Sequence, residues 1–275
     1  MSKIEWTNTT WNIITGCTKC SEGCKNCYAE RMHKRLTGMG QEKYREPFSK
    51  AIFHSKELNR VLGKNKLVFV NSMSDTFHEG IQDCEIRYLL AACRMQPFNQ
   101  FQILTKRAER LPDFKYPDNV WLGVTVENVK HKERIAYLKK TNAKIKFLSC
   151  EPLLEDLGKL DLNGIDWVIV GGESGPKARF IHPDWVRNIQ QQCKQQNIPF
   201  FFKQWGEWSP YKPNNEKNIK TAIYKPTCMG ISSLEQNLLF YKVGKTRAGS
   251  LLDGKRYKEL PAWEPWKGDK NGRFY

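Results

Sequence analysis

Short apolar runs alternate along the chain with amphipathic segments, which is the pattern of strands joined by helices. Leu67–Val70 is a wholly apolar run of β-forming residues, typical of a strand buried on both faces. Within residues 83–96, Ile86, Leu90 and Cys93 recur on one helical face and predict an amphipathic helix. Strand-like and helix-like patterns therefore alternate along the chain.

The same signals predict six more strands and several helices. We expect further strands at residues 11–14, 101–104, 120–126, 147–148, 167–170 and 200–202, and further helices at residues 28–36, at 129–140, after Pro183 and, as a short helix capped by Ser55, near residue 58. Seven short strands with helical or looped crossovers predict an α/β fold, a partial (incomplete) parallel β/α barrel of six or seven strands. The crossovers after residues 101–104 and 147–148 look too short for full helices.

The periodicity fades after Trp205, and a run of prolines and asparagines near residues 210–215 indicates a linker. We therefore predict a barrel over residues 1–206. Residues 207–275 would form a small C-terminal extension, with a strand near residues 238–243. No internal repeat interrupts either part.

Polar residues follow each expected strand. They are Thr15 with a cysteine-rich loop, residues 71–75, residues 105–107, Thr125 with Glu127 and Asn128, Ser149 with Glu151, residues 171–175, and residues 203–205. Apolar strands that all end in polar residues predict a site at the carboxyl edge of a parallel barrel. The alternative is that strand ends meet solvent and that loops are polar in any case.

The most concentrated chemistry is a set of four cysteines within eleven residues: Cys17, Cys20, Cys24 and Cys27. Read from the second cysteine, the spacing is C-x3-C-x2-C, by which radical S-adenosylmethionine (SAM) enzymes hold three irons of a [4Fe–4S] cluster. Thiolate-rich loops with short spacings suit such clusters. Three thiolates leave the fourth iron free to chelate a small molecule.

Other interpretations of these cysteines are weaker. A structural zinc site usually takes two CxxC pairs separated by a long spacer, and here the pairs lie three residues apart. Disulfides are disfavoured by the odd total of nine cysteines and by the lack of a secretory signal. A bacterial ferredoxin run would have proline where this chain has Tyr28.

The amino-acid composition indicates a basic protein of the soluble class. The net charge is +16, which favours polyanionic partners, nucleic acid being the commonest. The alternative is a lysine-rich, solvated surface. No apolar run reaches the ~20 residues of a membrane helix. The N-terminal segment has no apolar signal core, so we expect a cytoplasmic protein.

Several segments carry a resemblance that covers nearly the whole chain: TWNIITGC, GCKNCYAERM, FVNSMSDTFHE, WLGVTVEN, FLSCEPLL, VIVGGESGPKAR, PFFFKQWGEW and AGSLLDGKRYKELP. On these the chain resembles a phage-borne three-cysteine protein family of unknown function (a phage Gp family), which is similar to radical SAM enzymes. In that family the positions of Cys17, Cys24 and Cys27 recur, whereas the position of Cys20 is often apolar. Cys17 and Cys20 therefore compete for the first iron.

The resemblance implies a [4Fe–4S] cluster and SAM as cofactors, with reductive cleavage of SAM to a 5′-deoxyadenosyl radical and an external electron donor. Ser72, Ser74 and Asp75 lie where radical SAM enzymes usually hold the methionyl ammonium group. Contacts to the ribose or the carboxylate of SAM are expected from Thr125, Glu127 and Asn128.

Two further groups of residues complete the expected site. Gly171 and Gly172 would let the backbone approach a flat ligand such as adenine. Glu173 would accept hydrogen bonds from ligand amines or form a salt bridge with Lys203. Trp205 would stack on a base or fill the core. The candidate catalytic residues are Glu151, Lys203 and Gln204.

Three functions are compatible with this sequence. The first is a radical SAM enzyme that modifies or repairs a nucleic acid or nucleotide. The second is a zinc-stabilised nucleic-acid-binding protein without catalysis. The third is a radical SAM enzyme that acts on a peptide or a small metabolite. The sequence does not predict an oligomeric state.

Overall fold

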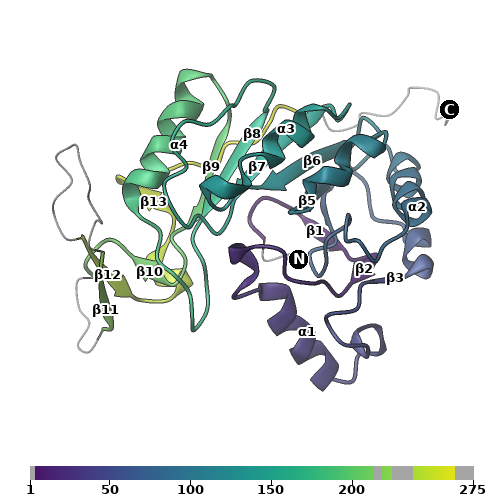
Figure 1. Ribbon diagram of the computed structural model, residues 1–275, viewed down its shortest axis with the longest axis horizontal. Helices are drawn as coiled ribbons and strands as arrows, with labels where there is room; N and C mark the ends of the chain where they lie inside the picture. The colour runs from purple at the N-terminus through teal and green to yellow at the C-terminus, as the bar shows by residue number, and fades with distance from the viewer. Residues whose placement is uncertain (1–3, 214–218, 225–237, 264–275) are drawn as a thin grey trace.

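Seven parallel strands form one curled sheet in a computed structural model that describes residues 4–213, 219–224 and 238–263 (Figure 1). The order in the sheet is β1-β4-β5-β6-β7-β8-β9, which follows the chain. The strands are β1 (Thr9–Trp11), β4 (Leu67–Val70), β5 (Gln100–Thr105), β6 (Val120–Thr125), β7 (Ile145–Cys150), β8 (Trp167–Gly171) and β9 (Phe200–Gln204). The sheet is a half-barrel, so the predicted partial parallel β/α barrel is confirmed.

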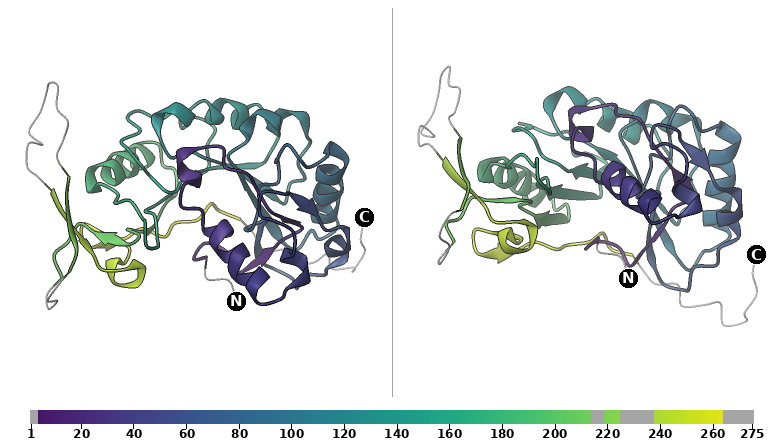
Figure 2. Two further views of the ribbon diagram at one scale, coloured as in Figure 1. Left: turned by 60° about the horizontal axis from the view of Figure 1, so that its bottom comes forward. Right: turned by 90° about the horizontal axis from the view of Figure 1, so that it is seen from below.

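Four α-helices accompany the half-barrel: α1 (Tyr28–Gly38), α2 (Asp83–Arg94), α3 (Arg134–Lys139) and α4 (Pro183–Gln195). Helices α2, α3 and α4 lie along the outer side of the sheet, and α1 lies apart from them (Figure 2). Helix α2 begins at a capping box between Gln82 and Glu85. Helix α4 begins with Pro183, and the His182 ring accepts a hydrogen bond from the Asp184 amide.

Short 3-10 helices and strands fill the connections. They are η1 (Glu22–Cys24), η2 (Glu42–Tyr44), η3 (Ser55–Asn59), η4 (Ala108–Asp113) and η5 (Val129–His131), with the antiparallel pair β2 (Ile14–Thr15) and β3 (Ile52–Phe53). The predicted short crossovers are confirmed. The β5–β6 crossover contains only η4, and the fully described β7–β8 crossover contains no helix.

Three predicted elements differ in detail. The strand expected at residues 11–14 is divided, because the Asn71 side chain accepts the amides of Ile13 and Ile14 and bends the chain between β1 and β2. The helix expected at 129–140 is divided into η5 and α3. The short helix near Leu58 is of the 3-10 type, and its cap position is His54 rather than Ser55.

The concave face of the sheet is filled at its amino end by aromatic side chains. Trp167 lies 5.6 Å from Phe147, 6.0 Å from Phe201 and 6.1 Å from Trp121, measured between ring centroids. Trp6, from the segment before β1, packs into the same cluster. Each such ring buries about 150–250 Å². This plug closes one end of the half-barrel and leaves polar groups at the other.

The C-terminal extension forms a small sheet of its own and then returns to the half-barrel. Its elements are β10 (Trp208–Ser209), β11 (Thr221–Tyr224), β12 (Leu238–Lys242), α5 (Lys245–Ala248), β13 (Leu251–Leu252) and β14 (Lys255–Arg256). The amide of Phe202 donates to the carbonyl of Tyr257 (2.9 Å), and that of Trp205 to Gly249 (3.0 Å). These contacts cover the free edge of β9.

The expected strand near residues 238–243 is therefore confirmed as β12. The division of the chain at residue 206 into separate domains stays a prediction. In the described part of the chain, no helix has the length and apolar character needed to cross a bilayer. A cytoplasmic location stays a prediction as well.

Candidate functional site at the carboxyl edge of the half-barrel

Since all seven strands are parallel, their carboxyl ends meet at one edge of the sheet, which we call the carboxyl edge. The concave face changes character toward this edge. The aromatic plug gives way to Lys106 after β5, Thr125 at the end of β6, Glu151 after β7 and Lys203 in β9. The Lys106 amine lies 3.3 Å from the Thr125 hydroxyl, and the Lys203 amine 3.2 Å from Glu151. The edge therefore holds polar groups from four of the five strands between β5 and β9.

The cysteine loop, residues 16–27, crosses this edge between β2 and α1. Gly16 begins it with a positive φ of 80°, and a Cβ there would lie 2.0 Å from the Lys50 carbonyl oxygen. Gly16 also forms an isolated bridge with Ser74, whose hydroxyl donates to the Gly16 carbonyl. The Cys17 amide donates to the Phe48 carbonyl (2.6 Å). Only glycine fits this entry into the loop.

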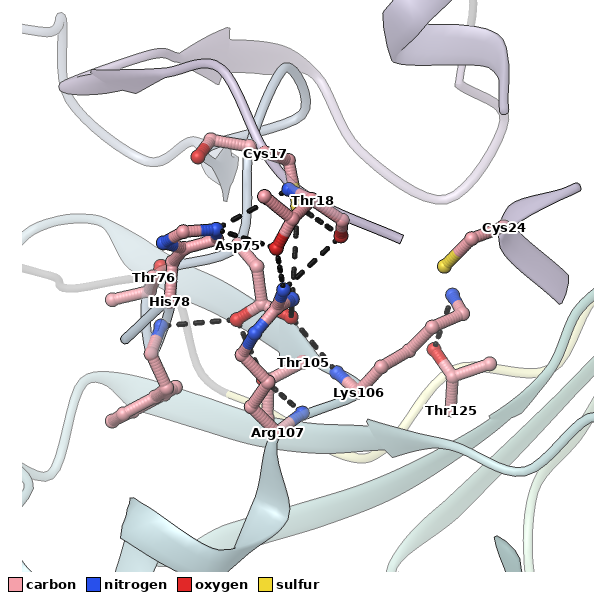
Figure 3. A network of polar contacts seen from close by, with 12 residues as sticks. Cys17, Thr18, Cys24, Asp75, Thr76, His78, Thr105, Lys106, Arg107 and Thr125 are labelled. Atoms are coloured by element: carbon pink, nitrogen blue, oxygen red, sulfur yellow. Dashed lines mark hydrogen bonds and ion pairs between the residues drawn. The ribbon is translucent and has the colours of Figure 1, made fainter. Parts of the chain in front are cut away.

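Arg107 fastens the start of the cysteine loop to the end of β5 (Figure 3). Its guanidinium donates to the Thr18 hydroxyl (2.8 Å) and to the Thr18 carbonyl (3.1 Å), and it lies 3.6 Å from the Cys17 sulfur. It also pairs with Glu79 (2.6 Å) and with Asp75 (3.5 Å). Its side chain is buried, so five partners hold one cation in a fixed place.

Asp75 is the centre of this network. One carboxylate oxygen accepts the Thr105 hydroxyl (2.6 Å) and the Phe77 amide (3.0 Å). The other oxygen accepts the Lys106 amide (3.0 Å) and faces Arg107. Protein donors thus occupy both oxygens.

Ser72 and Ser74 are engaged with protein groups as well. The Ser72 hydroxyl donates to the Asn12 side chain (3.0 Å), and that of Ser74 donates to Gly16. Together with Asp75, they hold loops together in this structure. The expected contact of these three residues with SAM stays a prediction.

A second fastening lies at the other end of the cysteine loop. Glu173, after β8, pairs with Arg179 (2.7 Å) and accepts from the Asn26 amide group (3.0 Å). Arg179 donates in turn to the Glu22 carbonyl (3.1 Å). Burial acts to raise the pKa of Glu173, but the hydrogen bonds from Arg179 and Asn26 hold it below its usual value. The alternative that Glu173 forms a salt bridge with Lys203 is wrong, since Lys203 pairs with Glu151 instead. The alternative that Glu173 accepts hydrogen bonds from ligand amines stays a prediction.

The cysteine thiols differ in their electrostatic surroundings. The hydrogen bond from Cys20 and the positive charge of Lys106 lower the pKa of Cys24 to about 4, although burial acts against them. That same hydrogen bond, with burial, raises the pKa of Cys20. Burial and the charge of Asp75 raise the pKa of Cys17 to about 12. Figure 3 shows the Lys106 amine beside the Cys24 sulfur. Among these thiols, Cys24 is therefore the one whose surroundings favour the thiolate form.

The donor set suits a thiolate-bound metal group by its chemistry. Cys24 acts electrostatically on both Cys17 and Cys20, and Cys27 follows at the cap position of α1. Lys106 and Arg107 supply positive charge beside sulfur ligands. Among the described residues, however, no three Cys, His, Asp or Glu side chains are gathered closely enough to hold a metal ion. A cluster would therefore need these thiols to draw together.

The middle of the edge contains the residues expected to contact ribose. Glu127 is fully buried, pairs with Arg134 (2.8 Å) and packs against Gly23, where a Cβ would lie 2.9 Å from its carboxylate. Asn128 donates to Glu22 (3.1 Å), and its buried side-chain oxygen has no partner among the described residues. Thr125, Glu127 and Asn128 thus lie directly beneath the cysteine loop.

The far end of the edge brings the three candidate catalytic residues together. A β-bulge places Lys203 and Gln204 opposite the single residue Gly171. Glu151 packs against the same glycine, where a Cβ would lie 2.4 Å from its carboxylate oxygen. The Gln204 amide group donates to the Gly172 carbonyl (2.8 Å). Gly171 thus leaves room for the Glu151 carboxylate. The expected approach of a flat ligand to the backbone of Gly171 and Gly172 stays a prediction.

Trp205 belongs to the core. Its side chain is fully buried and its indole donates to the Leu251 carbonyl (2.8 Å), so the expectation that it stacks on a base is wrong. A Cβ on Gly172 would lie 1.9 Å from the Trp205 carbonyl oxygen, which explains that glycine as well. The second glycine of this segment thus makes room for the chain of β9.

Sequence reasoning did not assign several residues of the site. Lys106 and Arg107 directly follow a predicted strand, so their position was a usable signal. No local sequence pattern marks Arg179, Asn26 or Gly23. The partners of Asn26 and Gly23 lie more than 100 residues away in the chain, and the partner of Arg179 lies on a loop.

The comparison with protein families gives one match. Residues 1–261 match the family model described as Protein of unknown function (DUF5131). The chain belongs to this family. No curated protein and no solved structure matches it significantly. The DUF5131 description names neither a phage origin nor radical SAM chemistry, so both stay predictions for this DUF5131 protein.

Proposed function

We propose that this protein is a radical SAM enzyme whose cysteine loop holds a [4Fe–4S] cluster at the carboxyl edge of the half-barrel. The observation that carries the proposal is the placement of four thiols on a loop that crosses this edge, with the Lys106 amine beside the Cys24 sulfur (Figure 3). Parallel β/α barrels build their active sites at this edge. A cluster held by these cysteines, together with SAM, would supply the chemistry of hydrogen abstraction from a substrate.

The chain's own residues would hold and shield this group. Cys24 and Cys27, with Cys17 or Cys20, are the proposed ligands. Arg107, after β5, and Glu173, after β8, keep the two ends of the loop in place at separate points along the carboxyl edge. The aromatic plug around Trp167 closes the amino end of the half-barrel and excludes water from below. The plug therefore closes the end of the half-barrel that lies opposite the carboxyl edge.

A nucleic acid or nucleotide is the proposed substrate. The support is the net charge of +16, together with basic side chains at the carboxyl edge such as Lys106, Arg179 and Lys203. Turnover would require an external electron donor. Binding of DNA or RNA that weakens steeply with added salt supports this class, and salt-independent behaviour favours a peptide or metabolite substrate instead.

Release of 5′-deoxyadenosine tests the reaction. Protein reconstituted without oxygen is incubated with SAM and a strong reductant, and the products are separated by chromatography. We expect 5′-deoxyadenosine from the wild type and none from a Cys24→Ala/Cys27→Ala variant. Cys84→Ala is the matched control, since Cys84 is an exposed thiol outside the loop and its loss leaves product formation unchanged. Equal product from all three proteins, or none from the wild type, contradicts the proposal.

A further inference from the structure

The far end of the carboxyl edge contains acceptors that the protein leaves without donors. Glu151 uses one carboxylate oxygen for Lys203, while its other oxygen is buried and has no partner among the described residues. The side-chain oxygen of Gln204 is also buried and without a partner among the described residues. Both flank Gly171. A buried acceptor without a donor costs about 1–3 kcal/mol, so such a pair marks a place where a ligand with N–H or O–H groups is stabilised.

The C-terminal extension adds a cation at this place. Lys245 lies on α5, and the residue that follows this helix, Gly249, accepts a hydrogen bond from the amide of Trp205 (3.0 Å), the neighbour of Gln204. The charges that act on the Lys245 ammonium group are those of Lys203, Lys258, Glu5 and Glu151. Lys258 is paired with Glu5 (2.6 Å) and Lys203 with Glu151 (3.2 Å). Lys245 is exposed as a residue and forms no ion pair with any other described residue, although partial burial of its ammonium group lowers its pKa. Of these three lysines, Lys245 is thus the one without a paired carboxylate among the described residues.

We propose that Glu151, Gln204 and Lys245 form a nucleotide-binding site. Lys245 binds the phosphate, and the two unpartnered oxygens accept hydrogen bonds from the base or the sugar. A nucleotide combines donors and an anionic group in one molecule, which is what this set of residues requires. The inference rests on the proposed function and narrows its substrate class. It also gives the C-terminal extension a role, because only the extension supplies the phosphate contact.

Binding of deoxynucleoside 5′-monophosphates tests the site. Isothermal titration calorimetry of the full-length protein is carried out without SAM, first with each of the four monophosphates and then with the matching deoxynucleosides. Lys245→Gln removes the phosphate contact. Lys255→Gln is the matched control, since Lys255 is an exposed lysine on β14 of the same extension. Circular dichroism confirms that both variants are folded.

We expect Lys245→Gln to weaken monophosphate binding about tenfold and to leave deoxynucleoside binding unchanged, because one charge-assisted hydrogen bond is lost. Lys255→Gln should change neither affinity. With a short single-stranded oligonucleotide, Lys245→Gln should lower the slope of log affinity against log salt by about 0.7. Glu151→Gln should weaken monophosphate and deoxynucleoside alike.

Three results overturn the inference: no monophosphate binding to the wild type, equal affinity in the wild type and Lys245→Gln, or a Lys245-dependent affinity for free amino acids in place of nucleotides. Because these titrations need no SAM cleavage, they are independent of the radical reaction. A protein that releases 5′-deoxyadenosine but binds no nucleotide refutes only the site, and the converse result refutes only the radical chemistry.

Discussion

Asp75 and Glu151 are carboxylates at the same edge of one sheet, but they differ in whether the protein supplies hydrogen-bond donors to both of their oxygens. Asp75, near β5, receives a hydroxyl, two amides and a guanidinium, so its oxygens are filled by the protein itself. Glu151, after β7, receives Lys203 on one oxygen and leaves the other without a described partner. Polar residues at strand ends therefore serve two purposes.

The end of the carboxyl edge near Asp75, where the protein supplies donors to both carboxylate oxygens, is called the filled end, and it holds the cysteine loop in place. Asp75 orients Arg107, and Arg107 binds Thr18 beside the first cysteine. The unfilled end lies further along the edge, where Gln204 also keeps a buried oxygen without a donor. A saturated network stabilises the protein in the absence of any ligand, whereas unpartnered acceptors are stabilised only when a ligand arrives. We therefore assign support of the loop to the first end and ligand contact to the second.

The largest expected effect comes from Asp75→Asn. The substitution removes the charge that Arg107 faces and replaces an acceptor oxygen by an NH2 group, so it should lower the free energy of unfolding by about 3–5 kcal/mol. Asp83→Asn is the control, because Asp83 is exposed in the first turn of α2 and its loss should cost less than about 1 kcal/mol. Urea denaturation measures both. Equal costs would mean that the Asp75 network is not a support.

Acidification should weaken the filled end next. Burial and the charge of Arg107 lower the pKa of His78, whose ring accepts the Gly80 amide (3.0 Å) and lies 2.9 Å from the Thr18 hydroxyl. Because the folded protein favours the neutral ring, its contribution is complete above the unfolded pKa of about 6.5 and is lost as the pH falls below it.

Urea denaturation at neutral pH and at mildly acidic pH tests this dependence. Three other histidines, His33, His54 and His182, also have lowered pKa values and add to the acid loss of the wild type. A His78→Asn variant isolates the contribution of His78, since it should lose less stability between the two pH values than the wild type. An identical loss in both proteins would show that His78 does not titrate with unfolding.

The smallest expected effect on stability comes from Glu151→Gln. Glutamine keeps an acceptor for Lys203 and nearly the same shape, and the oxygen beside Gly171 has no described donor to lose. The free energy of unfolding should change by less than about 1 kcal/mol. If Glu151→Gln lowered the free energy of unfolding as much as Asp75→Asn, Glu151 would support the fold as Asp75 does, and the distinction between the two ends of the edge would be wrong.

The fold was largely readable from the sequence. Leu67–Val70 is a strand over its predicted residues, and the face of α2 that carries Ile86, Leu90 and Cys93 is buried as expected. Boundaries failed where tertiary contacts decide them. Asn71 reaches across 57 residues of chain to end the strand expected at residues 11–14, and no local pattern shows that contact.

The positions of the candidate site residues could be predicted from the sequence, but the role of each residue could not. Strand ends located Asp75, Glu151 and Lys203 at one edge, because parallel topology alone places them there. Which carboxylate is filled depends on partners distant in the sequence, such as Arg107 for Asp75. Trp205 shows the same limit, since its burial under the extension is invisible before the chain folds.

The metal and sulfide content of protein purified without oxygen tests the central claim most directly. For the wild type and Cys84→Ala we expect about four irons and about four acid-labile sulfides per chain. The Cys24→Ala/Cys27→Ala variant should contain neither. Zinc without sulfide in the wild type, or iron and sulfide retained by the double variant, would contradict the assignment of the cysteine loop as the seat of a [4Fe–4S] cluster.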